Sequence, residues 1–88
     1  ESLVDFARRV LDGFEALARL HIGETILVVT HGGVLDILYR HATGRRLQAK
    51  RDFVVPNAAL NWLERHADGW RVLLWADRRH LEATLDEL

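Results

Sequence analysis

The chain has no cysteine and only one proline among its 88 residues. Without cysteine, disulfide bonds and thiolate metal sites are excluded, and the composition is compatible with the cytoplasm, where we expect the protein to be located. No apolar run reaches the roughly 18 residues that a membrane-spanning helix needs, and the first residues lack the pattern of a signal peptide. We therefore expect no membrane partner.

An excess of charge of one sign is also lacking, because the net charge at pH 7 is only −1. Proteins that bind nucleic acid usually carry a clear basic excess, so we expect no nucleic-acid partner. Hydrophobic residues make up 49% and charged residues 28%, which is typical of a folded domain rather than a disordered chain. The length suits one small domain, and we treat residues 1–88 as a single unit.

Hydrophobic spacing predicts two helices. Apolar residues recur every three or four positions over residues 2–21, and Ser2 is a suitable N-cap. A second apolar face follows residues 34–43 and ends at Gly44, a residue type that favours the C-terminus of a helix.

The remaining pattern predicts strands. Residues 25–30, "TILVVT", form a continuous β-branched run, which indicates a strand covered on both faces, as in a parallel sheet. Residues 59–65 and 70–76 flank an Asp68-Gly69 turn and predict a β-hairpin. The tail from residue 80 to residue 88 is either a short helix or disordered. This element order predicts an α/β fold, and so few strands suggest part of a larger sheet.

His31 stands where the predicted strand ends and the second helix begins, and Gly32 and Gly33 follow it. The first N–H groups of a helix are unpaired and favour an anion, and glycine lets a ligand approach the backbone closely. The imidazole can donate a hydrogen bond or carry a positive charge near neutral pH. The arrangement suits phosphate or a developing oxyanion. The residues alone leave open a second interpretation, in which His31 satisfies local backbone groups and the glycines only permit a tight turn.

The motifs resemble the second half of the histidine phosphatase superfamily, the group that contains cofactor-dependent phosphoglycerate mutases and related phosphatases. Glu1 and Ser2 stand where the family has a Glu-Ser opening to a helix, and Arg9 stands eight residues after the glutamate. Residues 30–32, Thr-His-Gly, match the end of the family's strand. Later positions also match frequent family residues of the closing hairpin: Asn57, Asp77, His80 and Leu81.

This resemblance implies part of a three-layer α/β/α sandwich (phosphoglycerate mutase-like), with helix-strand-helix followed by a β-hairpin. It implies phosphoryl transfer or phosphate-ester hydrolysis on a small phosphorylated metabolite through a phosphohistidine. His31 is then catalytic as the second histidine of the phosphate pocket, and Gly32 is a phosphate contact. Glu1, Arg9 and Thr30 are implied as structural residues near the site. We expect no cofactor and no metal.

The family's nucleophile lies in an Arg-His-Gly motif, and no such motif occurs in these 88 residues. We therefore expect the chain to be the C-terminal portion of a histidine phosphatase-like domain, inactive alone, that needs an N-terminal segment or forms a homo-oligomer. The alternative is a non-catalytic phosphate-binding or interaction module. The residues do not distinguish a mutase from a phosphatase, and they do not name the substrate.

Two further groups of residues carry weaker signals. Asp77 and His80 are three positions apart, but a metal site needs more ligands and no third one is evident. A basic cluster after the second helix either steers an anionic substrate or is an ordinary solvated surface; it consists of Arg45, Arg46, Lys50 and Arg51.

Overall fold

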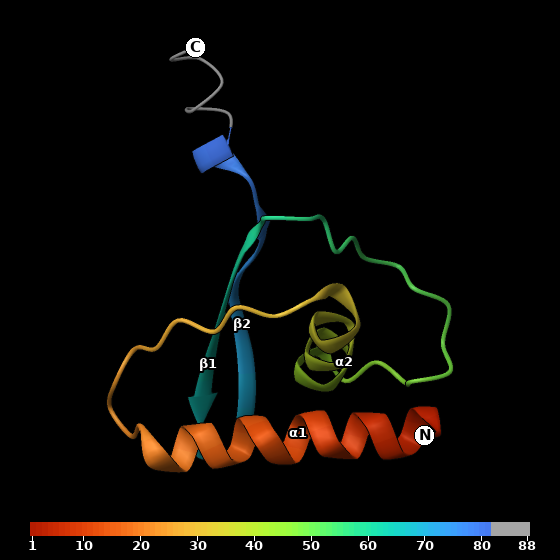
Figure 1. Cartoon of the computed structure of the whole chain (residues 1–88), viewed down its shortest axis with the longest axis horizontal. Helices are drawn as coiled ribbons and strands as arrows, with labels where there is room; N and C mark the ends of the chain where they lie inside the picture. The colour runs from red at the N-terminus through yellow and green to blue at the C-terminus, as the bar shows by residue number, and fades with distance from the viewer. Residues whose placement is uncertain (82–88) are drawn as a thin grey trace.

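The computed structural model describes residues 1–81, which form two helices followed by an antiparallel β-hairpin (Figure 1). Helix α1 spans Leu3–Leu20 and helix α2 spans Gly32–Thr43. Strand β1 spans Leu60–His66 and strand β2 spans Gly69–Asp77. The predicted α/β class is confirmed. The predicted tail lies for the most part in residues 82–88, outside the described residues.

The start of α1 follows from its N-cap. The Ser2 backbone is extended, and its hydroxyl oxygen accepts a hydrogen bond from the Asp5 N–H at 3.1 Å. This bond satisfies one of the N–H groups that a helix start leaves unpaired. The predicted cap is confirmed, and the helix bounds agree with the prediction to within one residue.

Helix α2 ends at Thr43, and Gly44 is its C-cap. Gly44 adopts the left-handed conformation with φ 74°, and the N–H of Arg45 then donates to the Arg40 carbonyl at 2.8 Å. A left-handed residue after the last turn is a common helix ending because it closes such bonds. The predicted end is confirmed, while the helix starts at Gly32, two residues earlier than predicted.

The structure corrects the prediction for residues 25–30. This segment lacks regular structure and is not a strand: within residues 1–81, the sheet consists of β1 and β2 alone. A strand is defined by its ladder of hydrogen bonds to a neighbour, and no neighbour for this segment lies in the described residues. Leu27 and Val29 are 85% and 89% exposed, not covered as predicted. The apolar pattern indicates that this segment is suited to a sheet. It does not indicate which strand would pair with the segment.

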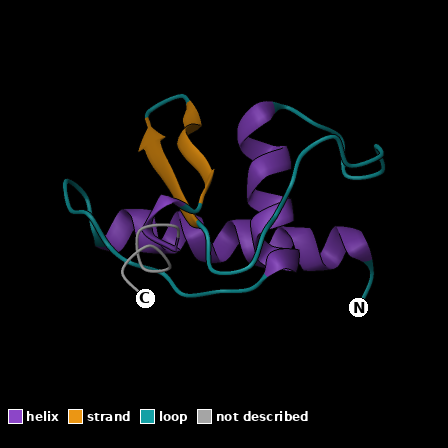
Figure 2. Cartoon of the chain, turned by 90° about the horizontal axis from the view of Figure 1, so that it is seen from above, coloured by secondary structure: helices purple, strands orange, loops and turns teal. Residues whose placement is uncertain are grey.

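The core lies where α1 crosses α2. Its buried side chains come from both helices: Ala7, Val10, Ile37 and Leu38. Leu63 of β1 packs against this cluster, so the hairpin covers the same core. Figure 2 shows α2 and the hairpin side by side over α1.

The predicted hairpin is confirmed, with Leu63 opposite Val72 and His66 opposite Gly69 at the turn. Glu15 fastens the hairpin to α1: its Oε1 accepts the Trp70 indole N–H at 2.8 Å. This bond, reinforced by the Arg65 guanidinium, holds the pKa of Glu15 below its ordinary value. Neither helix described here has the length and apolarity to span a bilayer.

Candidate functional site

His31 occupies the N-cap position of α2. Its backbone is extended, with φ −120° and ψ 171°, and its carbonyl accepts the N–H groups of Val34 and Leu35 at 3.1 and 3.2 Å. The backbone of His31 therefore starts the helix. Its exposed imidazole makes no capping hydrogen bond within the described residues. The ring is left available for a ligand.

The two glycines after His31 leave donors beside the ring. Among residues 1–81, the N–H groups of Gly32 and Gly33 have no hydrogen-bond acceptor. These groups carry the positive end of the helix dipole. A Cβ on Gly33 would lie 3.6 Å from His31 Nδ1, so the imidazole folds back close to the helix start. The turn therefore offers a ring and two backbone donors in one place, which suits an anion.

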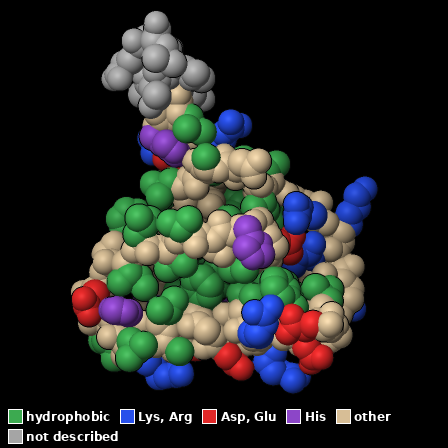
Figure 3. Space-filling view, in the orientation of Figure 1, with side chains coloured by type: hydrophobic (Ala, Val, Ile, Leu, Met, Phe, Trp, Pro, Cys, Tyr) green, Lys and Arg blue, Asp and Glu red, His purple; other side chains and the backbone are tan. Residues whose placement is uncertain are grey.

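A groove of about 1180 Å³ runs past this turn. Its lining includes residues 30–32, the apolar segment 25–29, and residues 55–59 that precede β1. Figure 3 shows hydrophobic side chains exposed on the face between α1 and the segment above it. The groove is mostly apolar, with His31 among its polar groups, as is usual where a few polar groups orient a ligand.

Glu1 and Arg9, which the resemblance implies as structural residues near the site, form an ion pair in the structure. Arg9 Nε and Nη2 donate to the two carboxylate oxygens of Glu1 at 3.1 and 3.0 Å, and these hydrogen bonds lower the pKa of Glu1. The pair is exposed, so its contribution to stability is small. It reaches the turn indirectly: Arg9 lies over the Phe6 ring, and that ring is 3.9 Å from the position of a Gly33 Cβ. Arg9 and Thr30 also line a second cavity, of about 270 Å³.

Two residues that lie beside the His31 turn were not indicated by the sequence pattern. Phe6 packs beside Gly33, and Val55 Cγ1 lies 3.8 Å from where a Gly32 Cβ would stand. In the sequence, Phe6 is one member of an apolar stripe and Val55 merely precedes Pro56. Nothing in the spacing marks either residue as a neighbour of His31, because both contacts are made by distant parts of the chain.

Three of the other candidate residues form ion pairs with neighbouring side chains: Arg45, Arg51 and Asp77. Asp77 binds Arg79, whose guanidinium and backbone N–H lower the pKa of Asp77 to about 2. The described residues contain no group of three or more side chains suited to a metal ion. Within the basic cluster, Arg45 pairs with Asp52 and Arg51 pairs with Asp36. Half of that cluster is therefore neutralised locally.

Comparisons with known proteins agree with the motif spacing. The family model of the histidine phosphatase superfamily (branch 1) matches residues 1–78. A metal-independent phosphoserine phosphatase from Arabidopsis thaliana is 36% identical over 83 residues, which cover 94% of this chain and 33% of that protein. Phosphoglycerate mutase-like protein 4, from the same plant, is 35% identical over 85 residues, covering 96% and 36%.

No solved structure gives a significant match. The chain spans about a third of the length of the curated relatives it matches. The family model nevertheless covers nearly the whole chain, from the Glu1–Arg9 pair through the His31 turn to the end of the hairpin. The chain therefore belongs to the histidine phosphatase superfamily, branch 1.

Proposed function

We propose that the protein transfers or hydrolyses the phosphoryl group of a small phosphorylated metabolite, and that His31 and the Gly32 N–H hold its oxygens. One observation carries this proposal: a free imidazole at the start of α2 stands beside two backbone N–H groups without acceptors in the described residues. The names of two relatives, a phosphoserine phosphatase and a phosphoglycerate mutase-like protein, support the same class of reaction.

The chemistry fits these groups. In phosphoryl transfer, negative charge spreads over three equatorial oxygens, and catalysis consists mainly of positioning and charge stabilisation. In the proposed reaction, a histidine of the family's Arg-His-Gly motif attacks phosphorus, so that a P–N bond forms as the ester P–O bond breaks. A carboxylic acid protonates the leaving oxygen. Water then cleaves the P–N bond and releases phosphate, or an acceptor hydroxyl takes the group instead.

The test is His31→Ala in the full-length protein, by which we mean this chain joined to the N-terminal segment that we propose precedes it. We expect kcat/KM for p-nitrophenyl phosphate to fall by about 100- to 1,000-fold, as when one preorganised donor to a transition state is removed. The melting temperature should stay the same, because the His31 side chain makes no capping bond within the described residues. His41→Ala, an exposed histidine on the same helix, is the matched control and should keep full activity. A full-rate His31→Ala protein would overturn the proposal.

Two additional assays refine the proposal. O-phosphoserine and 3-phosphoglycerate distinguish release of phosphate from its transfer between hydroxyl groups. The isolated 88-residue chain should turn over neither, because it contains no Arg-His-Gly motif. Turnover by this chain that His31→Ala abolishes would contradict that expectation. Binding of vanadate near His31 without any turnover by the full-length protein would favour the non-catalytic module.

A further inference from the structure

The loop between α2 and β1, residues 44–59, forms no helix or strand of its own. Loops longer than about 12–15 residues are uncommon in compact domains and are usually either functional or flexible linkers. The first part of this loop is fastened to α2, whereas residues 55–59 line the groove beside His31. The path of the fastened part therefore determines where the groove lining begins.

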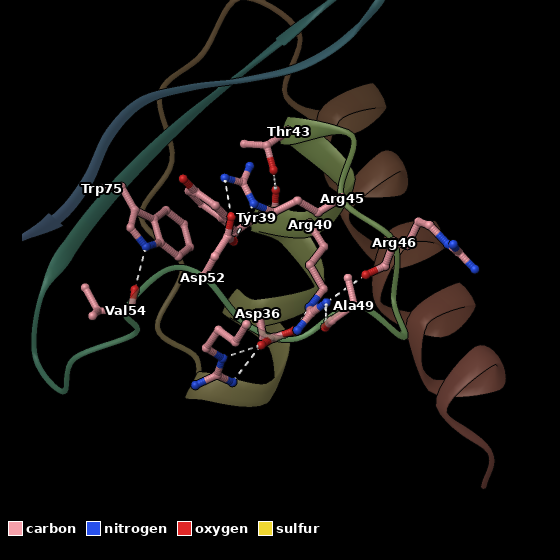
Figure 4. Close-up of polar contacts among 11 residues, drawn as sticks. Asp36, Tyr39, Arg40, Thr43, Arg45, Arg46, Ala49, Asp52, Val54 and Trp75 are labelled. Carbon is pink, nitrogen blue, oxygen red and sulfur yellow. Dashed lines mark hydrogen bonds and ion pairs between the residues drawn. The ribbon is translucent and has the colours of Figure 1, made fainter.

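Arg40 makes the central contacts. Its side chain is buried, and its Nε donates to Asp36 Oδ1 at 2.6 Å, one turn earlier on the same helix. Its Nη1 donates to the carbonyls of Arg46 and Ala49, both at 2.7 Å (Figure 4). Arg51 binds the other oxygen of Asp36 at 2.6 Å. We name Asp36, Arg40 and Arg51 the arginine clamp; it ties three points of the loop to the helix.

Aromatic contacts fix the next part of the loop. Phe53 stacks on Tyr39 of α2 with ring centroids 4.2 Å apart. The Trp75 indole N–H of β2 donates to the Val54 carbonyl at 2.8 Å. The loop is therefore fixed from its beginning through residue 54, by α2 on one side and by β2 on the other.

Val55 is the next residue, and it touches the site. Its Cγ1 lies 3.8 Å from where a Cβ on Gly32 would stand, which is ordinary van der Waals distance. Val55 and Gly32 line the same groove as His31. A shift of the loop would therefore move the groove wall against the turn that carries the free imidazole.

We infer that Arg40 is a positioning residue for the phosphate site: through the loop carbonyls it holds Val55 against Gly32 and sets the width of the groove beside His31. The inference rests on the proposed function of that site. Stability alone does not require this arrangement, because well-packed apolar side chains can often replace a buried ion pair at little cost. What apolar side chains cannot reproduce is the set of two carbonyl bonds that specifies the path of the loop.

The test compares substitutions in the full-length protein. Arg40→Met keeps the apolar stem and removes the donors, and we expect the KM for p-nitrophenyl phosphate to rise about tenfold with kcat within about twofold. Arg40→Lys retains the positive charge beside Asp36 and should recover part of that loss. Arg46→Met is the matched control. This substitution removes a charge from the same loop, but the exposed Arg46 side chain points away from Arg40 and Asp36 in Figure 4. KM should therefore stay within about twofold.

Two results would overturn the inference. If Arg40 matters only for stability, Arg40→Met reduces the number of folded molecules, and apparent kcat falls while KM is unchanged. If Arg46→Met raises KM as much as Arg40→Met does, the effect is one of charge and not of the clamp. Should Arg40→Met not fold, Arg51→Met takes its place, because it removes the exposed member of the same clamp, which binds Asp36 Oδ2. KM should then rise about two- to threefold, and an unchanged KM contradicts the inference.

A second measurement separates this inference from the proposed function. If the wild-type protein neither hydrolyses a phosphomonoester nor transfers its phosphoryl group to another hydroxyl, the proposed function fails, and amide nitrogen–proton NMR spectra of the same variants decide the role of Arg40. The resonances of Gly32 and Val55 should shift in Arg40→Met and stay in place in Arg46→Met. Unmoved resonances in Arg40→Met would contradict the positioning role whatever the activity.

Discussion

The polar groups at the two ends of helix α2 differ in whether they have hydrogen-bond partners in the protein. At the N-terminal end, the His31 ring and the N–H groups of Gly32 and Gly33 have no protein partner within residues 1–81. Near the C-terminal end, Arg40 donates three hydrogen bonds, two of them to loop carbonyls, and Gly44 closes the last turn. Unpaired polar groups cost free energy when they are buried, so a protein leaves them at a surface where a ligand can pair them.

This contrast indicates different roles for the two ends of α2. The C-terminal end is built to hold a loop, and its contacts are complete without any ligand. The N-terminal end leaves its donors without partners in the described residues, as the proposed phosphate site requires. Between the two ends lie Ile37 and Leu38, which anchor the helix in the core and on which both ends depend.

The largest expected effect comes from a substitution in the core, on which both ends of α2 depend. Leu38 is buried in the core, and Leu38→Ala in the 88-residue chain should lower the free energy of unfolding by about 2–5 kcal/mol. Such a loss is a large part of the total stability of a small domain. Urea denaturation followed by circular dichroism measures it. Leu27→Ala is the control: this side chain is 85% exposed and its loss should cost less than about 0.5 kcal/mol. Equal costs for the two would contradict the assigned core.

One substitution applied at each end gives the next largest effect. Gly44 has φ 74°, so Gly44→Ala should cost about 1–2 kcal/mol of stability through the strained left-handed backbone, and leave KM unchanged. Gly32→Ala should leave stability unchanged, since its Cβ meets only Val55 at 3.8 Å. Its kcat/KM in the full-length protein should fall about tenfold, because the Cβ obstructs approach of phosphate to the backbone. Urea denaturation and steady-state kinetics on both variants measure the two effects.

The opposite pattern would reverse the assignment of the two ends. If Gly32→Ala loses stability and Gly44→Ala loses activity, the turn at His31 is structural. The sequence alone left that interpretation of the histidine open.

The sequence predicted the features whose signals are local. The Ser2 cap, the Gly44 ending and the Asp68-Gly69 turn each depend on a few adjacent residues, and the structure has all three. The segment 25–30 was predicted as a strand and is not one, because pairing requires a neighbouring strand and none lies beside it within residues 1–81. Local pattern describes what a segment is suited for, and only the tertiary structure supplies its partner.

The residues of the candidate site show the same difference between local and long-range signals. His31 and Gly32 were found from a short motif at a strand-to-helix boundary, and their roles as phosphate contacts stay predictions. The arginine clamp was not found at all. Its contacts join α2 to loop residues up to fifteen positions away, and in the sequence Arg40 is one arginine on a polar helix face. Side chains that act through a loop leave no spacing that marks them.

The smallest expected effect is a pH dependence confined to the loop. Arg45 donates two hydrogen bonds to Asp52, and these bonds hold the pKa of Asp52 below its ordinary value of 3.8. A lowered pKa in the folded state means that the pair stabilises the fold above pH 3.8 and loses this contribution as the pH falls through the lowered pKa. The exposed pair is worth little in free energy, so the effect is best measured locally.

Carbon NMR titration of the Asp52 carboxyl should therefore give a midpoint below 3.8 in the wild-type protein and a higher one in Arg45→Met. Added salt should move the wild-type midpoint upward, since exposed charges are screened. In the same titration, the amide signals of Arg46 and Ala49 should shift with the Asp52 carboxyl, because their loop is tied by this pair. A midpoint for Asp52 at its ordinary value would contradict the pair, and the exposed side of the loop would then be held by the arginine clamp alone.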